Sequence, residues 1–395
     1  MNCEKLKLLA ADNYNWAVGK RRALHRIPEG GFDTFKTQQM ICDTLEELGI
    51  SYTTERTWVV GLIEGGHPGK TIALRADIDA LPVQEPKGCT FRSEHEGWMH
   101  ACGHDVHTAI QLGTARMLSS MRDQLHGNVK LFFQPAEETT GGALPMVNAG
   151  VLENPHVDAC YGLHLQPYLP LGTVETRAGT LNAATDEIEI IVRGKGGHAA
   201  YPECSVDAIV CASQIVSALQ TLVSRNISPL KSVVLTFGTI EGGRASNVIC
   251  DRVRLFGTLR TVDPKLHAYA LSRIREIAQG VALAYGATAE VNVLEGYTAL
   301  VNHERETELV MDLARMILGK GNLKVKGEPS MGGEDFSYFI ADTPGAFYHI
   351  GCTPLDKMPA PALHSPHFSP DERCIMTGML MQTAVVLAET DTEIE

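Results

Sequence analysis

Val129-Lys130-Leu131-Phe132-Phe133-Gln134-Pro135-Ala136-Glu137-Glu138 combines a largely apolar segment, a proline and two adjacent glutamates. Asn128 to Phe133 is an apolar run of strand length, and Pro135 ends it because proline cannot donate a hydrogen bond to a strand ladder. Helices are predicted from Val106 to Met121 and from Gly142 to Asn148, and a further strand from Val157 to Leu163. This alternation of strands and helices is typical of an α/β layered sheet.

The segments on either side continue the same pattern. Strands are predicted at Val59 to Ile63, Thr71 to Ala76 and Ala346 to Ile350, and helices at residues 4–26, 34–49 and 304–318 and from Asp371 onward. In an open sheet of this kind, ligands bind beyond the carboxyl ends of the strands. Glu137, Glu138 and His164 all fall at such ends. The sequence therefore places a candidate site there.

The middle of the chain has a different order of elements, namely strand, helix, strand, strand, helix and strand over residues 185–295. This is the order of a split βαβ, ferredoxin-like unit. Its first helix, from about Ser205, has apolar or small residues at steps of three and four, and its second is capped by Asp263 with Pro264 at the first position. We predict an inserted lid or dimerisation domain over 185–295, within a catalytic domain of residues 1–184 and 296–395.

Composition excludes several classes of protein. The chain has 395 residues, 44% hydrophobic and 21% charged, which suits a globular protein of two domains. The net charge of -13, with no basic cluster to offset it, argues against a nucleic-acid surface. Ten cysteines without a Cys-x-x-Cys pair favour reduced thiols in a cytoplasm. The charged N-terminus lacks the apolar core of a signal peptide, and no apolar stretch is expected to reach the roughly 18 residues of a membrane span.

Residues 99–107, Met-His-Ala-Cys-Gly-His-Asp-Val-His, concentrate metal-ligand types ahead of a helix. Thiolate and imidazole groups bind zinc and similar metals, and Gly103 lets the loop turn Cys102 and His104 toward one point. A histidine-rich loop is also common on ordinary surfaces. The segment therefore predicts a metal site only if a second group of ligands joins it.

Glu137 and Glu138 are candidates for that second group. A hydrolytic metal site needs one carboxylate as a ligand and another, unligated, as a proton acceptor. The alternative is a solvated acidic pair at a helix N-terminus, where acids are also favoured. His164 and His364 follow apolar residues and are either ligands or buried histidines of the core.

Six motifs in order make the sequence similar to the aminoacylase and carboxypeptidase-type co-catalytic metallo-amidohydrolases. They span residues 99–107, 132–138, 162–164, 196–199, 246–248 and 332–336. The Cys-Gly-His-Asp form of the first motif resembles the hippurate hydrolase and indole-3-acetyl-amino acid hydrolase branch. The resemblance runs from about residue 14 to the C-terminus and implies hydrolysis of N-acyl amino acids.

The resemblance also implies a site. Two divalent ions per subunit, zinc or manganese and alternatively nickel or cobalt, would be bound by Cys102, His104, Glu138, His164 and His364. Glu137 would be the catalytic base and acid. Other branches carry His-x-Asp on the early strand, where this chain has Arg75-Ala76-Asp77. Because Arg75 cannot bind a cation, Asp77 is left as a residue that orients a histidine. Cys102 is our candidate for the ligand that bridges the ions.

In the inserted domain, the resemblance implies a homodimer that sends His198 into the neighbouring active site as a donor to the oxyanion. Asn247 and Arg260 would bind the substrate, the latter through its carboxylate, and Gly333 would border the pocket. Each has an ordinary alternative. His198 could be a loop histidine, Asn247 a turn residue and Arg260 a solvated strand residue.

The expected mechanism has two ions that hold a hydroxide and polarise the amide carbonyl, with Glu137 moving the proton to the leaving amine. Dipeptidase or carboxypeptidase-like hydrolysis of small peptides is the alternative reaction. A thiol amidase with Cys102 as nucleophile and a metal-free binding protein of the same fold are further alternatives. The intact Glu137-Glu138 pair argues against the binding protein.

Overall fold

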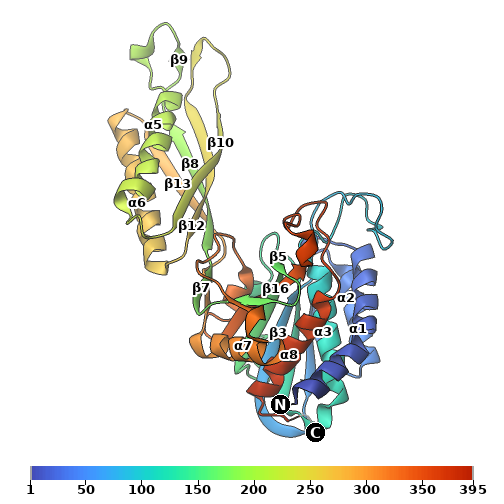
Figure 1. Ribbon diagram of the computed structural model, residues 1–395. Helices are drawn as coiled ribbons and strands as arrows, with labels where there is room; N and C mark the ends of the chain where they lie inside the picture. Colours follow the sequence, from blue (N-terminus) through green and yellow to red (C-terminus); the bar gives the residue numbers. More distant parts are fainter. Residues whose placement is uncertain (1, 394–395) are drawn as a thin grey trace. The chain divides into compact units, whose positions relative to one another are not determined.

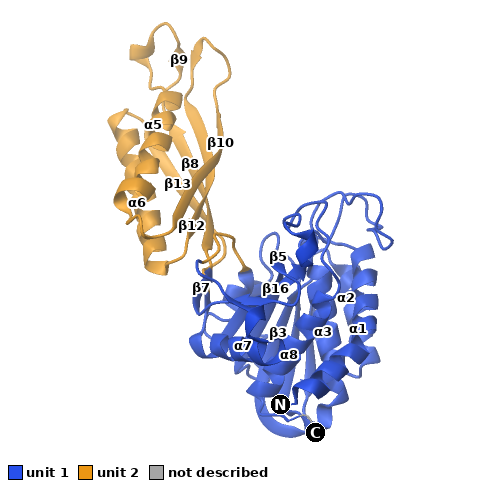
Figure 2. Cartoon of the chain, in the orientation of Figure 1, with its two compact units in different colours: residues 1–181, 301–328, 335–395 blue, residues 182–300, 329–334 orange. Residues whose placement is uncertain are grey.

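The computed structural model describes residues 2–393, in two compact units. Unit 1 comprises residues 1–181, 301–328 and 335–395, and unit 2 comprises residues 182–300 and 329–334 (Figure 2). Each unit has its own hydrophobic core. Together, an α/β unit and a smaller antiparallel unit confirm the predicted fold class.

An eight-stranded mixed sheet forms the centre of unit 1, in the order β1-β2-β4-β3-β5-β16-β6-β15 (Figure 1). Its strands are β1 (Ser51–Glu55), β2 (Trp58–Glu64), β3 (His67–Asp77), β4 (His126–Gln134), β5 (Ala159–Pro170), β6 (Val174–Thr176), β15 (Leu323–Val325) and β16 (Gly345–Thr353). The central strands β4, β3, β5 and β16 are parallel to one another. Their carboxyl ends therefore lie along one edge of the sheet.

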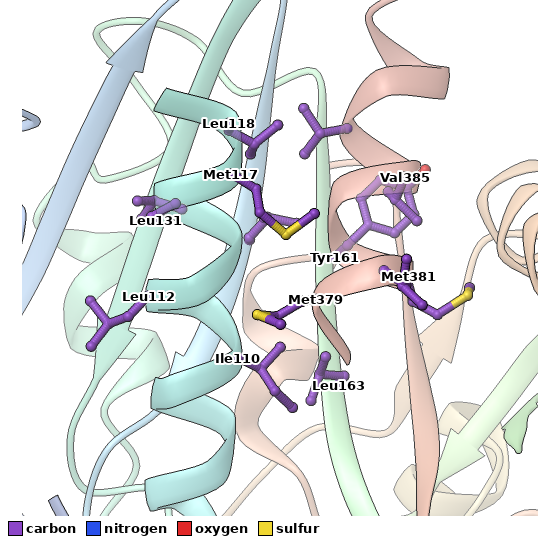
Figure 3. Packing of buried hydrophobic residues seen from close by; sticks show 14 of the residues in the cluster. Ile110, Leu112, Met117, Leu118, Leu131, Tyr161, Leu163, Met379, Met381 and Val385 are labelled. Carbon is purple, nitrogen blue, oxygen red and sulfur yellow. The ribbon is translucent and has the colours of Figure 1, made fainter. Parts of the chain in front are cut away.

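Helices cover this sheet: α1 (Cys3–Arg26), α2 (Phe35–Glu47), α3 (His104–Ser120), α4 (Ala143–Asn148), α7 (Glu304–Ile317) and α8 (Cys374–Glu389). Short 3-10 turns occupy Arg122–Gln124, Lys320–Asn322, Asp335–Tyr338 and Leu355–Lys357. Apolar side chains of α3, α8 and the strands interdigitate between these helices and the sheet (Figure 3). Burial of this apolar surface, at about 25 cal/mol per Å², is the main force that holds unit 1 together.

Two glycines let the helices α1, α3 and α8 approach closely. A Cβ atom on Gly113 of α3 would lie 2.3 Å from Sδ of Met379, and one on Gly378 of α8 would lie 2.4 Å from Cδ1 of Ile110. Both contacts are shorter than any van der Waals separation. The packing of α3, which carries His104 and His107, therefore depends on these two positions.

A buried carboxylate fixes the C-terminal end of α8. Glu389 accepts hydrogen bonds from the Tyr161 hydroxyl at 2.6 Å, from both terminal nitrogens of Arg305 at 2.8 and 2.9 Å, and from Lys70 at 3.0 Å. Burial alone raises the pKa of Glu389, but the Arg305, Tyr161 and Lys70 hydrogen bonds lower it to about 2. The last helix is thus tied to strands β3 and β5 and to α7.

Unit 2 is a four-stranded antiparallel sheet in the order β10-β12-β8-β13, covered by two helices. The elements are β8 (Ala184–Arg193), α5 (Ala208–Thr221), β10 (Val233–Gly242), β12 (Arg252–Thr261), α6 (Pro264–Ala284) and β13 (Thr288–Glu295). The short strands β9 (Gly197–His198) and β11 (Val248–Ile249) pair with each other, as do β7 (Gly179–Asn182) and β14 (Leu300–Asn302), and Pro202–Cys204 is a 3-10 turn. The chain order and strand order are those of the predicted ferredoxin-like unit.

Several element boundaries differ from the sequence prediction. The strand predicted over residues 248–259 is two strands, β11 and β12, because the backbone turns away at Cys250 to accept a hydrogen bond from Ala208 N–H. The last helix begins at Cys374 rather than Asp371, since the Asp371 side chain instead accepts hydrogen bonds from Arg373. Helix α3 begins at His104 rather than Val106, so His104 is helical rather than in the preceding loop.

The prediction that no stretch is long and apolar enough to span a membrane needs one correction. Within the described residues, Ala208–Asn226, which joins α5 to the π-helical turn Leu222–Asn226, passes that test by length and composition. Its side chains Ala208, Cys211, Ala212, Ile215 and Leu219 pack into the core of unit 2, as those of an amphipathic core helix do.

Candidate metal centre

The carboxyl edge of the unit 1 sheet carries the candidate site. Asp77 is the last residue of β3 and pairs in register with Gln134, the last residue of β4. Arg75 pairs with Gly162 of β5, so His164, two residues further on, lies beside the end of β3. Register alone therefore brings Asp77, the start of the Glu137 loop and His164 to one place.

The loop before α3 brings Cys102 and His104 to the same edge. Gly103 has a φ of 91°, in the left-handed region, and a Cβ atom there would lie 2.9 Å from Cδ1 of Leu165. Glycine is therefore required between the two candidate ligands. The Cys102 Sγ atom is 3.3 Å from His164 Nε2, and both side chains are buried.

Asp79, a residue that the sequence analysis did not select, holds the Glu137-Glu138 pair. Its two carboxylate oxygens accept hydrogen bonds from the backbone N–H groups of Glu137 and Glu138, each at 3.1 Å. Glu138 Oε1 in turn lies 3.1 Å from His364 Nε2 and 3.8 Å from His104 Nε2. The loop is thus fixed so that Glu138 lies between two histidines.

Arg75 links the strands beneath this loop. Its fully buried guanidinium donates to Gln134 at 2.8 Å, to Asp77 at 2.7 Å and to Asp335 at 2.9 Å. Asp335 also accepts hydrogen bonds from Gln134 and from the backbone N–H groups that open α4. Arg75 and Asp335 together hold both ends of the loop that carries Glu137 and Glu138.

Asp77 makes its shortest histidine contact with His107, which is not one of the implied ligands. The Asp77 carboxylate lies 2.6 Å from His107 Nδ1, and His107 Nε2 accepts a hydrogen bond from Leu165 N–H at 3.0 Å. This pairing places the proton of a neutral His107 on Nδ1. The histidine that Asp77 orients is thus His107. His107 in turn accepts a hydrogen bond from the backbone of Leu165, the residue after His164. Asp77 is 3.7 Å from His104 Nε2.

The implied ligands come together in three overlapping clusters, within each of which the ligand atoms lie within 4.8 Å of one another. These clusters are Cys102, Glu138 and His364; His104, Glu137 and Glu138; and Asp77, His104, His107 and His164. Glu138 and His104 each belong to two of them. An arrangement in which neighbouring clusters share ligands can hold two ions side by side.

The electrostatics of the centre favour a bound cation. Burial lowers the pKa of His104, but the carboxylates of Asp77, Asp79 and Glu138 raise it to about 10. Burial, followed by the charges of Glu138 and Glu137, raises the pKa of the Cys102 thiol well above its ordinary value. The carboxylates of the centre contribute to both shifts, as the cause that raises the pKa of His104 and as an addition to burial at Cys102. A divalent ion would displace both protons and offset the negative charge of these carboxylates.

The donor set fits divalent metals. Both ring nitrogens of His104 are buried, Nδ1 at 3.4 Å from Asp79 Oδ1 and Nε2 at 3.8 Å from Glu138 Oε1, and neither forms a hydrogen bond with the residues described, 2–393. Buried polar atoms without a partner are costly unless a ligand completes them. One thiolate, three imidazoles and carboxylates are ligands suited to zinc and related ions. The residues present therefore fit the pair of ions that the resemblance implies.

Two strained backbone positions lie beside the candidate ligands. Ala136, directly before Glu137, and His364 itself have φ angles of 63° and 65°. Non-glycine residues in this region cost on the order of 1–3 kcal/mol each and persist where surrounding contacts enforce them. His364 N–H donates to Ala101 O at 2.9 Å, which holds its strained backbone beside the Cys102 loop.

The remaining residues selected from the sequence belong to unit 2, where they form two separate groups. His198 of β9 pairs with Val248 of β11, and Ala199 N–H donates to Asn247 O at 3.0 Å, so His198 and Asn247 are neighbours. The His198 side chain is exposed and its ring centroid lies 5.5 Å from that of Tyr201. In the chain, His198 comes shortly after Arg193, the last residue of β8, so it belongs to that end of the unit 2 sheet.

Arg260 and Gly333 lie at the other end of the same sheet. Arg260, which is half-buried, pairs with Thr185 of β8, and a Cβ atom on Gly333 would lie 2.7 Å from Cγ2 of Thr185. Burial lowers the pKa of Arg260, against the opposing effect of Glu187 and Asp186. Thr185 and Arg193 are eight residues apart on β8, which corresponds to about 26 Å at 3.3 Å per residue. Within one chain, His198 and Arg260 therefore cannot contact the same small molecule.

Comparison with known proteins assigns the family. Residues 73–388 match the model of peptidase family M20/M25/M40. The chain is 42% identical to N-acetyldiaminopimelate deacetylase of Bacillus cytotoxicus, over 84% of this chain and 88% of that one. It is 41% identical to N-acetyl-L-cysteine deacetylase of Bacillus subtilis, over 95% and 89%. The chain therefore belongs to the M20/M25/M40 family and is a metal-dependent hydrolase of carbon–nitrogen bonds.

A solved structure agrees with this assignment. The YXEP protein of Bacillus subtilis, described as a dinuclear metal binding peptidase of the M20 family, superposes with a TM-score of 0.85 at 33% identity. The match covers 97% of this chain and 99% of that one. A dinuclear relative of the same fold is consistent with the overlapping ligand clusters of unit 1.

Proposed function

We propose that the protein hydrolyses the amide bond of N-acyl amino acids, releasing a carboxylate and a free amino acid. The observation that carries this proposal is the fixed loop in which Glu138 lies among His104, His364 and Cys102, with its neighbour Glu137 beside the same cluster. The named activities of the two deacetylases, both directed at N-acetyl amino acids, support the same substrate class. The Cys-Gly-His-Asp motif supports the hippurate and indole-3-acetyl-amino acid hydrolase branch.

In this proposal, Cys102, His104, Glu138, His164 and His364 hold two divalent ions, zinc or manganese and alternatively nickel or cobalt. When bound, such ions polarise a carbonyl and lower the pKa of water. Glu137, which is 9% exposed, accepts the proton of the attacking water through its carboxylate and delivers it to the leaving nitrogen. Asp79 keeps that carboxylate in place through the Glu137 N–H. His107 keeps the β5 backbone in place beside His164.

We further propose a homodimer in which His198 acts in the site of the other subunit. The separation of about 26 Å along β8 supports this arrangement, because one chain cannot bring its own His198 to the molecule that Arg260 binds. An imidazole donor from the partner would stabilise the oxyanion of the transition state. Arg260 would pair with the substrate carboxylate, Asn247 would donate through its amide, and Gly333 would border the pocket.

Two isosteric variants test the division of tasks between the glutamates. In Glu137→Gln we expect the metal content to match that of the wild-type protein while turnover falls by about 10²–10⁴-fold. In Glu138→Gln we expect the metal content itself to fall, because a ligand to the cluster is lost. Glu153→Gln, on an exposed glutamate, is the matched control for both. Elemental analysis and turnover are measured on the same samples.

A substrate panel tests the reaction class. It contains N-acetyl, N-benzoyl and N-indoleacetyl amino acids together with dipeptides, each assayed on protein of known metal content. Faster hydrolysis of the N-acyl amino acids is expected. Faster hydrolysis of the dipeptides would instead establish the carboxypeptidase-like reaction. Full turnover by Glu137→Gln with its metals in place would overturn the assigned role of Glu137.

A further inference from the structure

A second group of metal-ligand side chains lies in unit 1, apart from the centre described above. It consists of His25 near the end of α1, Glu85 and Cys89, whose ligand atoms lie within 4.8 Å of one another. His25 is 3% exposed and Glu85 is 5% exposed, while Cys89 is half-buried. The three residues come from two segments about 60 positions apart in the sequence. The fold therefore brings together an imidazole, a carboxylate and a thiol.

The two buried members are held as metal ligands usually are. His25 Nδ1 lies 2.8 Å from the Asp105 carboxylate, which leaves Nε2 directed at Glu85 Oε1, 3.3 Å away. A carboxylate on the far nitrogen of a histidine is the common supporting contact of metal-binding imidazoles. Ser93 N–H donates to the other oxygen of Glu85 at 2.6 Å. Each ligand is thus oriented by a partner on its far side.

The spacing of the ligands suits a tetrahedral ion. Bonds of about 2.0–2.1 Å to nitrogen and oxygen at the tetrahedral angle place two ligand atoms about 3.3–3.4 Å apart. The 3.3 Å between His25 Nε2 and Glu85 Oε1 agrees with this separation. Cys89 supplies a third ligand, and a cavity of about 170 Å³ lined by His25, Glu85, Cys89 and Phe91 leaves room for a water molecule as the fourth.

The surrounding charges are compatible with a cation. Arg21 also lines the cavity, but its guanidinium is paired with Asp105 at 2.8 Å and with Glu372 at 3.3 Å. His100, 2% exposed, lies with its ring centroid 6.2 Å from that of His25, and neither of its nitrogens has a hydrogen-bond partner among residues 2–393. The neighbourhood therefore also holds a buried imidazole with unused donor capacity.

We propose that His25, Glu85 and Cys89 bind a further divalent ion of the zinc class, with water completing the coordination. A thiolate, an imidazole and a carboxylate favour zinc or cadmium over magnesium or calcium, which prefer oxygen ligands. The ion would link helix α1, through His25, to the segment that contains Glu85, Cys89 and Ser93. Its role would be structural, since this cluster shares no residue with the clusters around Glu138.

The first test measures bound cadmium in the full-length protein after equilibration with excess Cd²⁺ and removal of free ion. Cys89→Ser should bind about one equivalent less than the wild type, while Cys204→Ser, which alters an exposed cysteine, should match the wild type. The comparison is a difference between variants, so it does not depend on how many ions the centre at Glu138 holds. Equal cadmium content in the wild type and Cys89→Ser would overturn the proposal.

The second test uses the unaltered protein. Alkylation by N-ethylmaleimide is followed by mass spectrometry at individual cysteines, with and without Zn²⁺. We expect Zn²⁺ to slow the modification of Cys89 at least about tenfold, since a metal-bound thiolate is a poor nucleophile, and to leave Cys204 unaffected. The same rate at Cys89 with and without Zn²⁺ contradicts the proposed site, whatever happens at Cys102.

Discussion

Replacing Arg75 by methionine should destabilise unit 1 strongly, because it removes one member of a buried ionic cluster and leaves the others. Arg75 is fully buried and donates to Asp77, Gln134 and Asp335 at 2.7–2.9 Å. Breaking a buried pair from one side costs about 3–5 kcal/mol, since the remaining charge has lost its compensation. In the variant, Asp77 retains its hydrogen bond with His107, and Asp335 retains its hydrogen bond with Gln134. We therefore expect the free energy of unfolding to fall by about 3 kcal/mol, the lower end of that range.

Urea unfolding followed by tryptophan fluorescence measures this loss. The three tryptophans, Trp16, Trp58 and Trp98, all belong to unit 1, so the signal reports on that unit. With an m-value of about 3 kcal/mol per M, a loss of 3 kcal/mol lowers the urea midpoint by about 1 M.

Arg315→Met is the matched control. Arg315 is 42% exposed and pairs with Asp312 on the surface of α7, so its loss should cost less than about 1 kcal/mol. If Arg75→Met and Arg315→Met lowered the midpoint equally, the assigned role of the Arg75 cluster would be refuted.

Two further predictions concern stability. The folded-state pKa of Glu389, about 2, lies below its ordinary value of 4.5, so its contribution is complete above pH 4.5 and is lost as the pH falls toward 2. Over that window, the free energy of unfolding of the wild-type protein, measured with urea, should fall by up to about 3 kcal/mol. Glu389→Gln should show a smaller fall. Parallel pH profiles for the two proteins would contradict the prediction. Gly378→Ala should cost about 1–3 kcal/mol because its Cβ would overlap Ile110, whereas Gly19→Ala, in α1 of the same unit with open space around it, should be neutral or slightly stabilising. Equal midpoints for the two alanine variants would rule out the close packing of α3 and α8 as the cause.

The long apolar elements were predictable from sequence because periodicity records which face is buried. The central strands β3 and β4 and the capped helix α6 were recognised in this way. The short strands β6, β9 and β15 were not predicted, because two or three residues show no measurable period. Their pairing is decided by register with neighbours that are distant in sequence.

The site was predictable to a different degree. Cys102, His104 and the Glu137-Glu138 pair were visible as local clusters of chemistry, whereas His164 and His364 were selected through the family resemblance. The part played by Asp79 was missed, because a second acid after β3 has no distinguishing neighbour and becomes informative only when its contacts to Glu137 and Glu138 are seen. The one hint in the sequence is that Asp79 lies two residues after Asp77, directly beyond the end of strand β3. Asp335 falls within the motif at residues 332–336, but its contact with Arg75 joins residues 260 positions apart and was not predicted.

The interrupted course of unit 1 along the chain bears on how the protein is made. The sheet of unit 1 places β16 between β5 and β6, and α8 packs against α1 and α3, yet β16 and α8 are near the end of the chain. During synthesis, the first 181 residues leave the ribosome with an incomplete sheet, whereas the strands and helices of unit 2 emerge as one uninterrupted segment. Unit 2 can therefore fold while the nascent chain is still growing. The apolar faces of β5 and α3 stay uncovered until the last hundred or so residues arrive, which makes that interval the one in which a chaperone is most useful.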